Sequence, residues 1–206
     1  MATLTNDEMQ RVKRELLDNI LAVGAWPFVD IKYVYTVIQQ NIVSSSVSPT
    51  TSSTAVTSVG AGTITLASVA GLTVSTPVVI DVDDQRETVT IKSLSGNVMG
   101  ANFRKTHSGT YNVEPESSLT IFRGTMWDLS RIQDEINAAR PTAGIRGATD
   151  GQLYGGVGEK NRIEALRVEQ ARMRMDLASM CGLREYFARA NARARSLGGG
   201  AGSFGV

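Results

Sequence analysis

The stretch TITLASVAGLTVSTPVVIDVDDQRETVTIKSLSGNVMGANFRKTHSGTYNVE, residues 63–114, decides the fold of this chain. Apolar and polar residues alternate along it, as in TITL at its start and ETVT in its middle. Alternation with a period of two is typical of strands with one buried face. Asp83-Asp84 and Gly96-Asn97 are turn signals between such runs. The stretch therefore predicts a small antiparallel β-barrel or β-sandwich.

Helical periodicity precedes this stretch. Thr5 and Glu8 have the spacing of a capping box, and apolar residues then recur every three or four positions up to Gly24. A second apolar periodicity begins after Pro27 and spans residues 28–43. Its β-branched and aromatic residues also suit a strand. We predict a helix there, with the strand as the alternative.

Helical periodicity also follows the stretch. Thr125 can cap a helix that Pro141 stops. A glycine-rich segment at residues 142–158 then predicts a mobile loop. The last two predicted helices, separated by a break at Gly182, run from Glu159 to Cys181 and from Leu183 to Leu197.

These patterns predict an α+β fold in which a small antiparallel β-barrel or β-sandwich is inserted into a helical bundle. The discontinuous helical domain comprises residues 1–43 and 123–197, and the inserted β-domain comprises residues 59–122. Residues 44–58 are almost entirely Ser, Thr and Val, and this composition favours a linker. Residues 198–206 are glycine-rich and predict a flexible C-terminal tail.

The composition excludes several classes of protein. A formal net charge of +1 gives no overall attraction to nucleic acid or to an anionic membrane. The single cysteine, Cys181, excludes a disulfide within the chain and a CxxC zinc site. The most apolar segment, residues 20–38, is interrupted by Pro27, Asp30 and Lys32, and therefore predicts no membrane span.

A search for catalytic motifs finds none. His107 is the only histidine, so it cannot supply a metal cluster, and its setting favours a structural role in a turn. Asp81, Asp83 and Asp84 lack the glycine and glutamate spacing of a calcium loop. The glycines of residues 155–160 do not match a phosphate-binding loop. The sequence therefore predicts a non-enzymatic protein without a cofactor or a bound metal.

The one local charge anomaly lies near the C-terminus. From residue 159 to residue 197 there are nine Lys/Arg and five Asp/Glu, a net +4. On a helical wheel at about 100° per residue, the arginines of the last helix flank a narrow apolar seam on both sides. The arginines are Arg184, Arg189, Arg193 and Arg195, and the seam is Leu183, Phe187, Ala190, Ala194 and Leu197. This pattern favours docking against a protein partner, and Phe204 adds an apolar anchor in the tail.

Residues 63–114 resemble a small β-module common in bacteriophage virion proteins. The resemblance rests on five features: the strand Ile64 to Leu66, the turn at Gly71, the strand Val78 to Val82, ETVT at residues 87–90, and His107-Ser108-Gly109. The flanking helices, the arginine-rich last helix and the trailing tail resemble the head-to-tail adaptor (connector) proteins of tailed phages. In that family a ring, usually of twelve copies, lies beneath the portal, and the C-terminal segment inserts into the portal.

The resemblance implies a virion protein of the neck, made in the host cytoplasm, which joins the capsid to the tail. It implies as partners the portal protein, the next neck or tail protein and further copies of the chain, with DNA passing unrecognised through the channel and with no membrane. Its portal-contact candidates are Arg184, Phe187, Arg189, Arg193, Arg195 and Phe204. Two alternatives stay open: another neck, tail-completion or head-surface protein, and a DNA-binding accessory protein.

Overall fold

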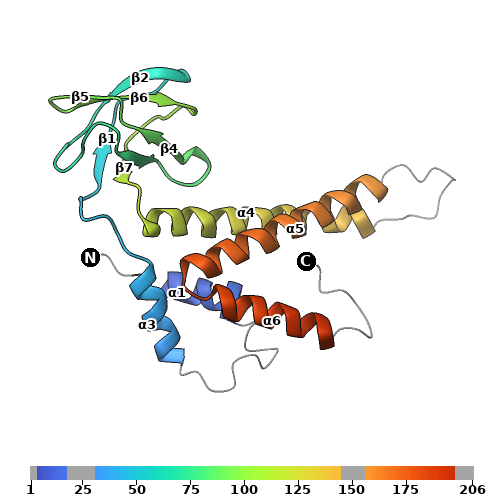
Figure 1. The fold of residues 1–206 in the computed structure, drawn as a ribbon. Coiled ribbons are helices and arrows are strands. Elements are labelled where there is room, and N and C mark those ends of the chain that lie inside the picture. Colours follow the sequence, from blue (N-terminus) through green and yellow to red (C-terminus); the bar gives the residue numbers. More distant parts are fainter. Residues whose placement is uncertain (1–3, 18–30, 145–155, 198–206) are drawn as a thin grey trace. The chain divides into compact units, whose positions relative to one another are not determined.

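A computed structural model describes residues 4–17, 31–144 and 156–197 (Figure 1). These residues form antiparallel sheets and α-helices, which confirms the α+β class. The chain divides into two compact units. The β-unit contains residues 42–124, and the helical unit combines the described residues before Ile42 with those from Thr125 to Leu197.

The β-unit contains seven strands in two antiparallel sheets, with all of residues 42–124 described. The strand order is β1-β7-β3-β4 in one sheet and β2-β6-β5 in the other. The bounds are β1 Thr50–Ser52, β2 Gly60–Thr65, β3 Pro77–Ile80, β4 Glu87–Thr90, β5 Ser93–Ser95, β6 Val98–Phe103 and β7 Tyr111–Pro115. The strands thus form two sheets, without the closed barrel that was one of the two expected forms.

Both predicted turns are present in the β-unit. Asp83–Gln85 form a short 3-10 helix, η2, between β3 and β4. Gly96 and Asn97 join β5 to β6, with Ser95 paired to Val98 across the turn. Gly96 has φ 53, a left-handed conformation that glycine adopts without steric cost.

The two sheets share one apolar core. Its members alternate along the strands, and β4, for example, is buried at every second residue. The buried cluster is Val56, Ile64, Leu66, Leu72, Val78, Ile80, Val89, Ile91, Met99, Ala101, Phe103, Tyr111 and Val113. Burial of a large aliphatic or aromatic side chain stabilises a fold by roughly 1.5–3 kcal/mol, so this cluster is the main source of stability in the β-unit.

The linker predicted for residues 44–58 is wrong over much of its length. Strand β1 lies inside it and pairs with β7, and Val56 forms a further bridge with His107. Thr50 and Ser52 are buried, as is Val56. Threonine and valine are favoured in strands, and their burial needs a partner strand distant in the sequence, which composition alone does not reveal.

The capping box predicted at Thr5 is confirmed. The Glu8 N–H donates to the Thr5 hydroxyl at 3.2 Å, and the Thr5 N–H donates to the Glu8 carboxylate at 2.7 Å. Helix α1 spans Asn6–Val12 and continues as a π-helical turn, η1, over Lys13–Leu17. The predicted helix end at Gly24 lies outside the described residues.

The second periodic segment is helical where the structure describes it. Helix α3 spans Ile31–Asn41, which confirms the choice of helix over strand for those residues. Val34 and Ile38, four residues apart, are both buried, so one face of α3 packs within the helical unit. The proposed start at Pro27 lies outside the described residues.

Helix α4 is longer than predicted at both ends, because it spans Ser118–Gly144. Its first turn is capped by Ser117, whose hydroxyl accepts from the Thr120 N–H at 3.2 Å while the Thr120 hydroxyl accepts from the Ser117 N–H at 2.9 Å. The expected cap at Thr125 is therefore wrong, because α4 begins at Ser118, inside the β-unit that ends at Gly124. Pro141 lies in the last turn, where its missing N–H costs a single helical hydrogen bond.

Helices α4 and α5 share an apolar cluster in the helical unit. Helix α5 spans Gly156–Met180, close to the prediction, whereas residues 145–155 of the predicted loop lie outside the described residues. Ile132 and Ile136 of α4 pack with Ile163 of α5. The remaining cluster members are the partly buried Ala139, Leu166 and Met173.

Polar contacts tie the start of the chain to these helices. The Arg174 guanidinium on α5 donates to the Glu15 carboxylate in η1 at 2.9 Å. The Arg11 guanidinium on α1 donates to the Met126 carbonyl at 3.1 Å and to the Ser130 hydroxyl at 2.6 Å on α4. Segments on both sides of the β-unit in the sequence therefore meet in one helical unit.

The predicted break at Gly182 is confirmed. The Gly182 N–H donates to the Ser179 carbonyl at 3.1 Å and the Leu183 N–H donates to the Ala178 carbonyl at 2.7 Å, which together form a Schellman cap. Gly182 has φ 72, as that cap requires. Helix α6 then spans Arg184–Leu197.

Candidate functional site

Five of the six predicted portal-contact residues, all but Phe204, lie on α6. Arg184 and Arg189 are exposed. The Arg189 guanidinium lies 3.6 Å from the Glu185 carboxylate, and both side chains are largely exposed, at 76% and 83%. Exposed pairs of this kind contribute little to stability, so the Arg189 charge is available to a partner at little cost.

Phe187 does not fit the set of portal-contact candidates, because its side chain is buried within its own chain. Its side chain is 3% exposed, and that of Leu183, one helical turn earlier, is 1% exposed. The predicted apolar seam of α6 therefore packs, at these two positions, inside the chain itself. The sequence predicts an amphipathic helix correctly at these positions. The same pattern, however, is produced by an apolar face that binds a partner and by one that packs in the protein's own core.

The other candidates are placed only in part. Arg193 and Arg195 lie on the described backbone of α6, while their side chains lie outside the description. Phe204, together with the predicted tail at residues 198–206, lies outside the described residues. Arg184 and Arg189 are therefore the two candidates with exposed side chains in the described part of α6.

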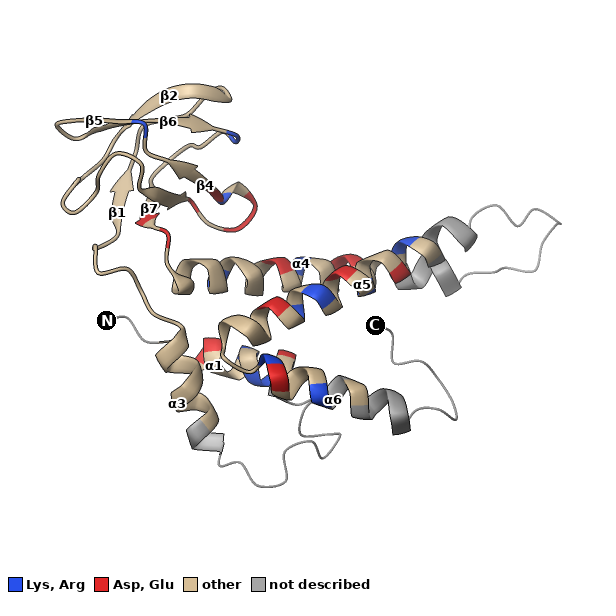
Figure 2. Ribbon diagram, viewed as in Figure 1, with Lys and Arg blue, Asp and Glu red and all other residues tan. Residues whose placement is uncertain are grey.

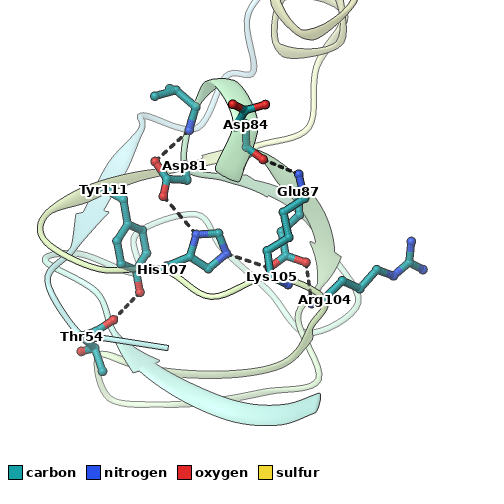
Figure 3. Close-up of polar contacts among 9 residues, drawn as sticks. Thr54, Asp81, Asp84, Glu87, Arg104, Lys105, His107 and Tyr111 are labelled. Carbon is teal, nitrogen blue, oxygen red and sulfur yellow. Dashed lines mark hydrogen bonds and ion pairs between the residues drawn. The ribbon is translucent and has the colours of Figure 1, made fainter. Parts of the chain in front are cut away.

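A second polar site lies in the β-unit, around His107 (Figure 3). The His107 side chain is buried, and its two ring nitrogens face two carboxylates. Nδ1 lies 3.0 Å from Oδ2 of Asp81, and Nε2 lies 2.7 Å from Oε1 of Glu87. The sequence singled out His107 and Asp81 for other reasons and missed Glu87, because the three residues are far apart along the chain.

Further hydrogen bonds satisfy the two carboxylates. The Glu87 carboxylate accepts from the backbone N–H of Arg104 at 2.7 Å and from that of Lys105 at 3.3 Å. The Asp81 carboxylate accepts from the backbone N–H of Val82 at 2.9 Å. Each ring nitrogen of His107 thus lies within hydrogen-bonding distance of a carboxylate that backbone N–H groups also hold in place. The network therefore joins the β3–β4 turn to the segment after β6.

Tyr111 packs beside this network. Its ring centroid lies 5.2 Å from that of His107, and its hydroxyl donates to the Thr54 carbonyl at 2.6 Å. Burial raises the pKa of the Tyr111 hydroxyl, a hydrogen bond with Ser52 opposes this, and the nearby Asp81 adds to the rise. The phenol therefore stays protonated and acts as a donor, holding the segment after β1 against β7.

The histidine and the cysteine of the chain are both buried. Each ring nitrogen of His107 lies within hydrogen-bonding distance of a carboxylate oxygen. Cys181 is buried, and burial raises the pKa of its thiol to about 12, so a nucleophilic thiolate does not form at neutral pH. Among residues 4–17, 31–144 and 156–197, no group of three or more His, Cys, Asp or Glu side chains is arranged to hold a metal ion.

The charges of the described surface are mixed. On α5, basic and acidic residues are interspersed, and Arg172 and Glu169 form an exposed pair at 3.1 Å (Figure 2). In the β-unit, acidic residues gather at the turn between β3 and β4, whereas β1 and β2 carry no charge. No helix in the described part of the chain is long and apolar enough to span a membrane.

Comparison with known proteins found no match to a protein family, to a curated protein or to a solved structure.

Proposed function

We propose that this chain is a structural protein of the virion of a tailed phage, a head-to-tail adaptor that forms a ring under the portal. In this role it joins the capsid to the tail and leaves a channel through which DNA passes. The proposed role is mechanical and needs no catalysis.

The observation that carries the proposal is the return of the chain to one helical unit after the β-unit. Arg174 with Glu15, and Arg11 with Ser130, connect segments that the whole β-unit separates in sequence. A helical bundle interrupted by an inserted β-module is the layout that the adaptor resemblance implies. In the proposal the helices form the body of the ring and the β-unit is an accessory module.

Helix α6 is the proposed portal-docking element. The buried Phe187 of α6 and the buried Leu183 just before it anchor the helix to the helical unit, while Arg184 and Arg189 extend into solvent. Arginine binds carboxylates in two parallel hydrogen bonds, so a partner with acidic side chains at the contact fits this surface best. Arg193, Arg195 and Phe204 are proposed to extend the contact.

Charge reversal gives the sharpest test of this docking. The double variant Arg184→Glu/Arg189→Glu is expected to abolish binding to the portal protein of the same phage, measured by pull-down and by electron microscopy of the complex. The matched control is Arg172→Glu, an exposed arginine on α5 that also has an acidic neighbour. A truncation before Leu183 is less clean, because it also removes two buried side chains. Portal binding that survives the double variant would rule out docking through α6.

The two remaining candidates have separate readouts. A tail-completion or head-surface protein would be found elsewhere than the neck when virions are labelled and imaged. A DNA-binding accessory protein would bind DNA with an affinity that falls steeply with salt, since its arginines would displace counterions from phosphates. Mixed charges along α5 and the Arg189–Glu185 pair on α6 argue against a continuous basic surface for DNA.

A further inference from the structure

Strand β2 has a hydrogen-bonded neighbour strand on one side only. That neighbour is β6, paired antiparallel along its whole length. The Leu66 N–H donates to the Asn97 carbonyl at 2.8 Å and continues this ladder. The backbone N–H and C=O groups of the even-numbered residues of β2 therefore point toward β6, and those of the odd-numbered residues point away from it. Thr65 agrees with this phase, because its N–H donates away from β6, to the Thr54 hydroxyl at 3.0 Å.

This alternation leaves two residues of β2 whose backbone N–H and C=O groups have no hydrogen-bond partner in the described chain. The N–H and C=O groups of Ala61 and Thr63 point away from β6, and no hydrogen bond within the described chain satisfies them. Both residues are exposed. β2 lies along the margin of the β-unit in Figure 1. The strand therefore presents two donors and two acceptors on a free edge.

The β2 edge lacks the features that normally prevent an edge strand from pairing with another chain. Natural edge strands are blunted by lysines, prolines, bulges or inward-pointing charges. β2 has none of these, and no charged residue occurs anywhere in residues 33–80. By contrast, β4 begins at Glu87 beside Arg86, and β5 follows Lys92 directly. The edge strand β1 is also uncharged, but it is short and follows Pro49, whereas β2 has neither a charge nor a proline beside it. This difference from the other edge strands indicates that β2 is covered in the working assembly.

The β2 edge is complementary to itself. When two copies are placed antiparallel about Gly62, Ala61 of each lies opposite Thr63 of the other. Each such pair exchanges two hydrogen bonds, so two pairs give four. Gly62 lies at the centre, and its missing side chain faces the interior, where an added Cβ would lie 3.3 Å from the Phe103 ring. Because the strand is uncharged, identical copies do not repel each other.

We propose that the β2 edge is an interface that pairs antiparallel with the β2 edge of a second copy of this chain. The contact continues the β2-β6-β5 sheet from one copy into the next, with small side chains and no charge at its centre. A two-fold contact joins copies in pairs and cannot close a ring by itself. The β2 edge is a different surface from α6, which is proposed to dock on the portal.

The test measures the mass of the full chain in solution, without portal, by native mass spectrometry and light scattering. The wild type is expected to form pairs. Ala61→Lys is expected to weaken the pairing roughly tenfold or more, because it puts a charge on the edge of each copy. Thr63→Lys, at the other exposed edge position, is expected to do the same.

The matched control is Thr57→Lys, which adds the same charge at an exposed, uncharged position outside β2 and is expected to leave the pairing intact. Unchanged thermal unfolding shows that the variants fold. A wild type that is monomeric at every concentration, or variants at residues 61 and 63 that pair as the wild type does, would overturn the proposal. Portal binding tests the other hypothesis separately: Ala61→Lys should retain it, and Arg184→Glu/Arg189→Glu should lose it while still pairing.

Discussion

Substitution of Gly182 by alanine tests the junction between α5 and α6. Gly182 has φ 72, where a side chain costs about 1–2 kcal/mol. An added Cβ would also lie 2.7 Å from the Asn41 amide nitrogen, which donates to the Val37 carbonyl at 2.8 Å. Displacing that amide forfeits a hydrogen bond of about 1 kcal/mol. We therefore expect Gly182→Ala to lower the free energy of unfolding by about 2–3 kcal/mol in total.

The assay is urea unfolding followed by the helical circular dichroism signal. Asn41→Ala serves as the background that removes the close contact, and there Gly182→Ala should cost only about 1–2 kcal/mol. Gly109→Ala is a second control, which isolates the backbone strain from the close contact. Gly109 has φ 73, and an added Cβ there would have nothing within 4 Å. An equal cost of Gly182→Ala in both backgrounds would refute the close contact, and a cost below about 0.5 kcal/mol would refute the strain as well.

Three further predictions concern single contacts. Glu87→Gln should destabilise the β-unit by about 1–3 kcal/mol, because the two carboxylate oxygens accept from the N–H groups of Arg104 and Lys105 and an amide has only one acceptor oxygen. Thermal unfolding measures this, and the control Glu114→Gln, at a half-exposed glutamate, should have little effect. Cys181 should resist alkylation at pH 8 until urea unfolds the chain, and rapid labelling of the native chain would contradict this. The free energy of unfolding should also fall as the pH rises from 9 toward 12, because in that range only the thiol of the unfolded chain ionises. Thr5→Ala should cost about 1 kcal/mol by loss of the helix cap, read from urea unfolding, and Thr5→Ser should restore most of it.

The sequence by itself determined the elements whose signals are local. The capping box at Thr5, the turn at Gly96 and the break at Gly182 each depend on the chemistry of a few adjacent residues. The same holds for the alternation that defines β4 and for the separation of a β-segment from helical flanks. Such signals survive in a single sequence because neighbouring residues alone fix the backbone dihedral angles.

Only the tertiary structure decided the features that join distant residues. Residues 50–56 form sheet contacts because β7 and His107 lie beside them, although their composition favours a linker. Phe187 is buried by its own chain, although its seam also suits a partner. His107 has two carboxylate partners that lie 20 and 26 residues away. In each case the deciding energy comes from burial or hydrogen bonding between segments that the chain brings together only after it folds.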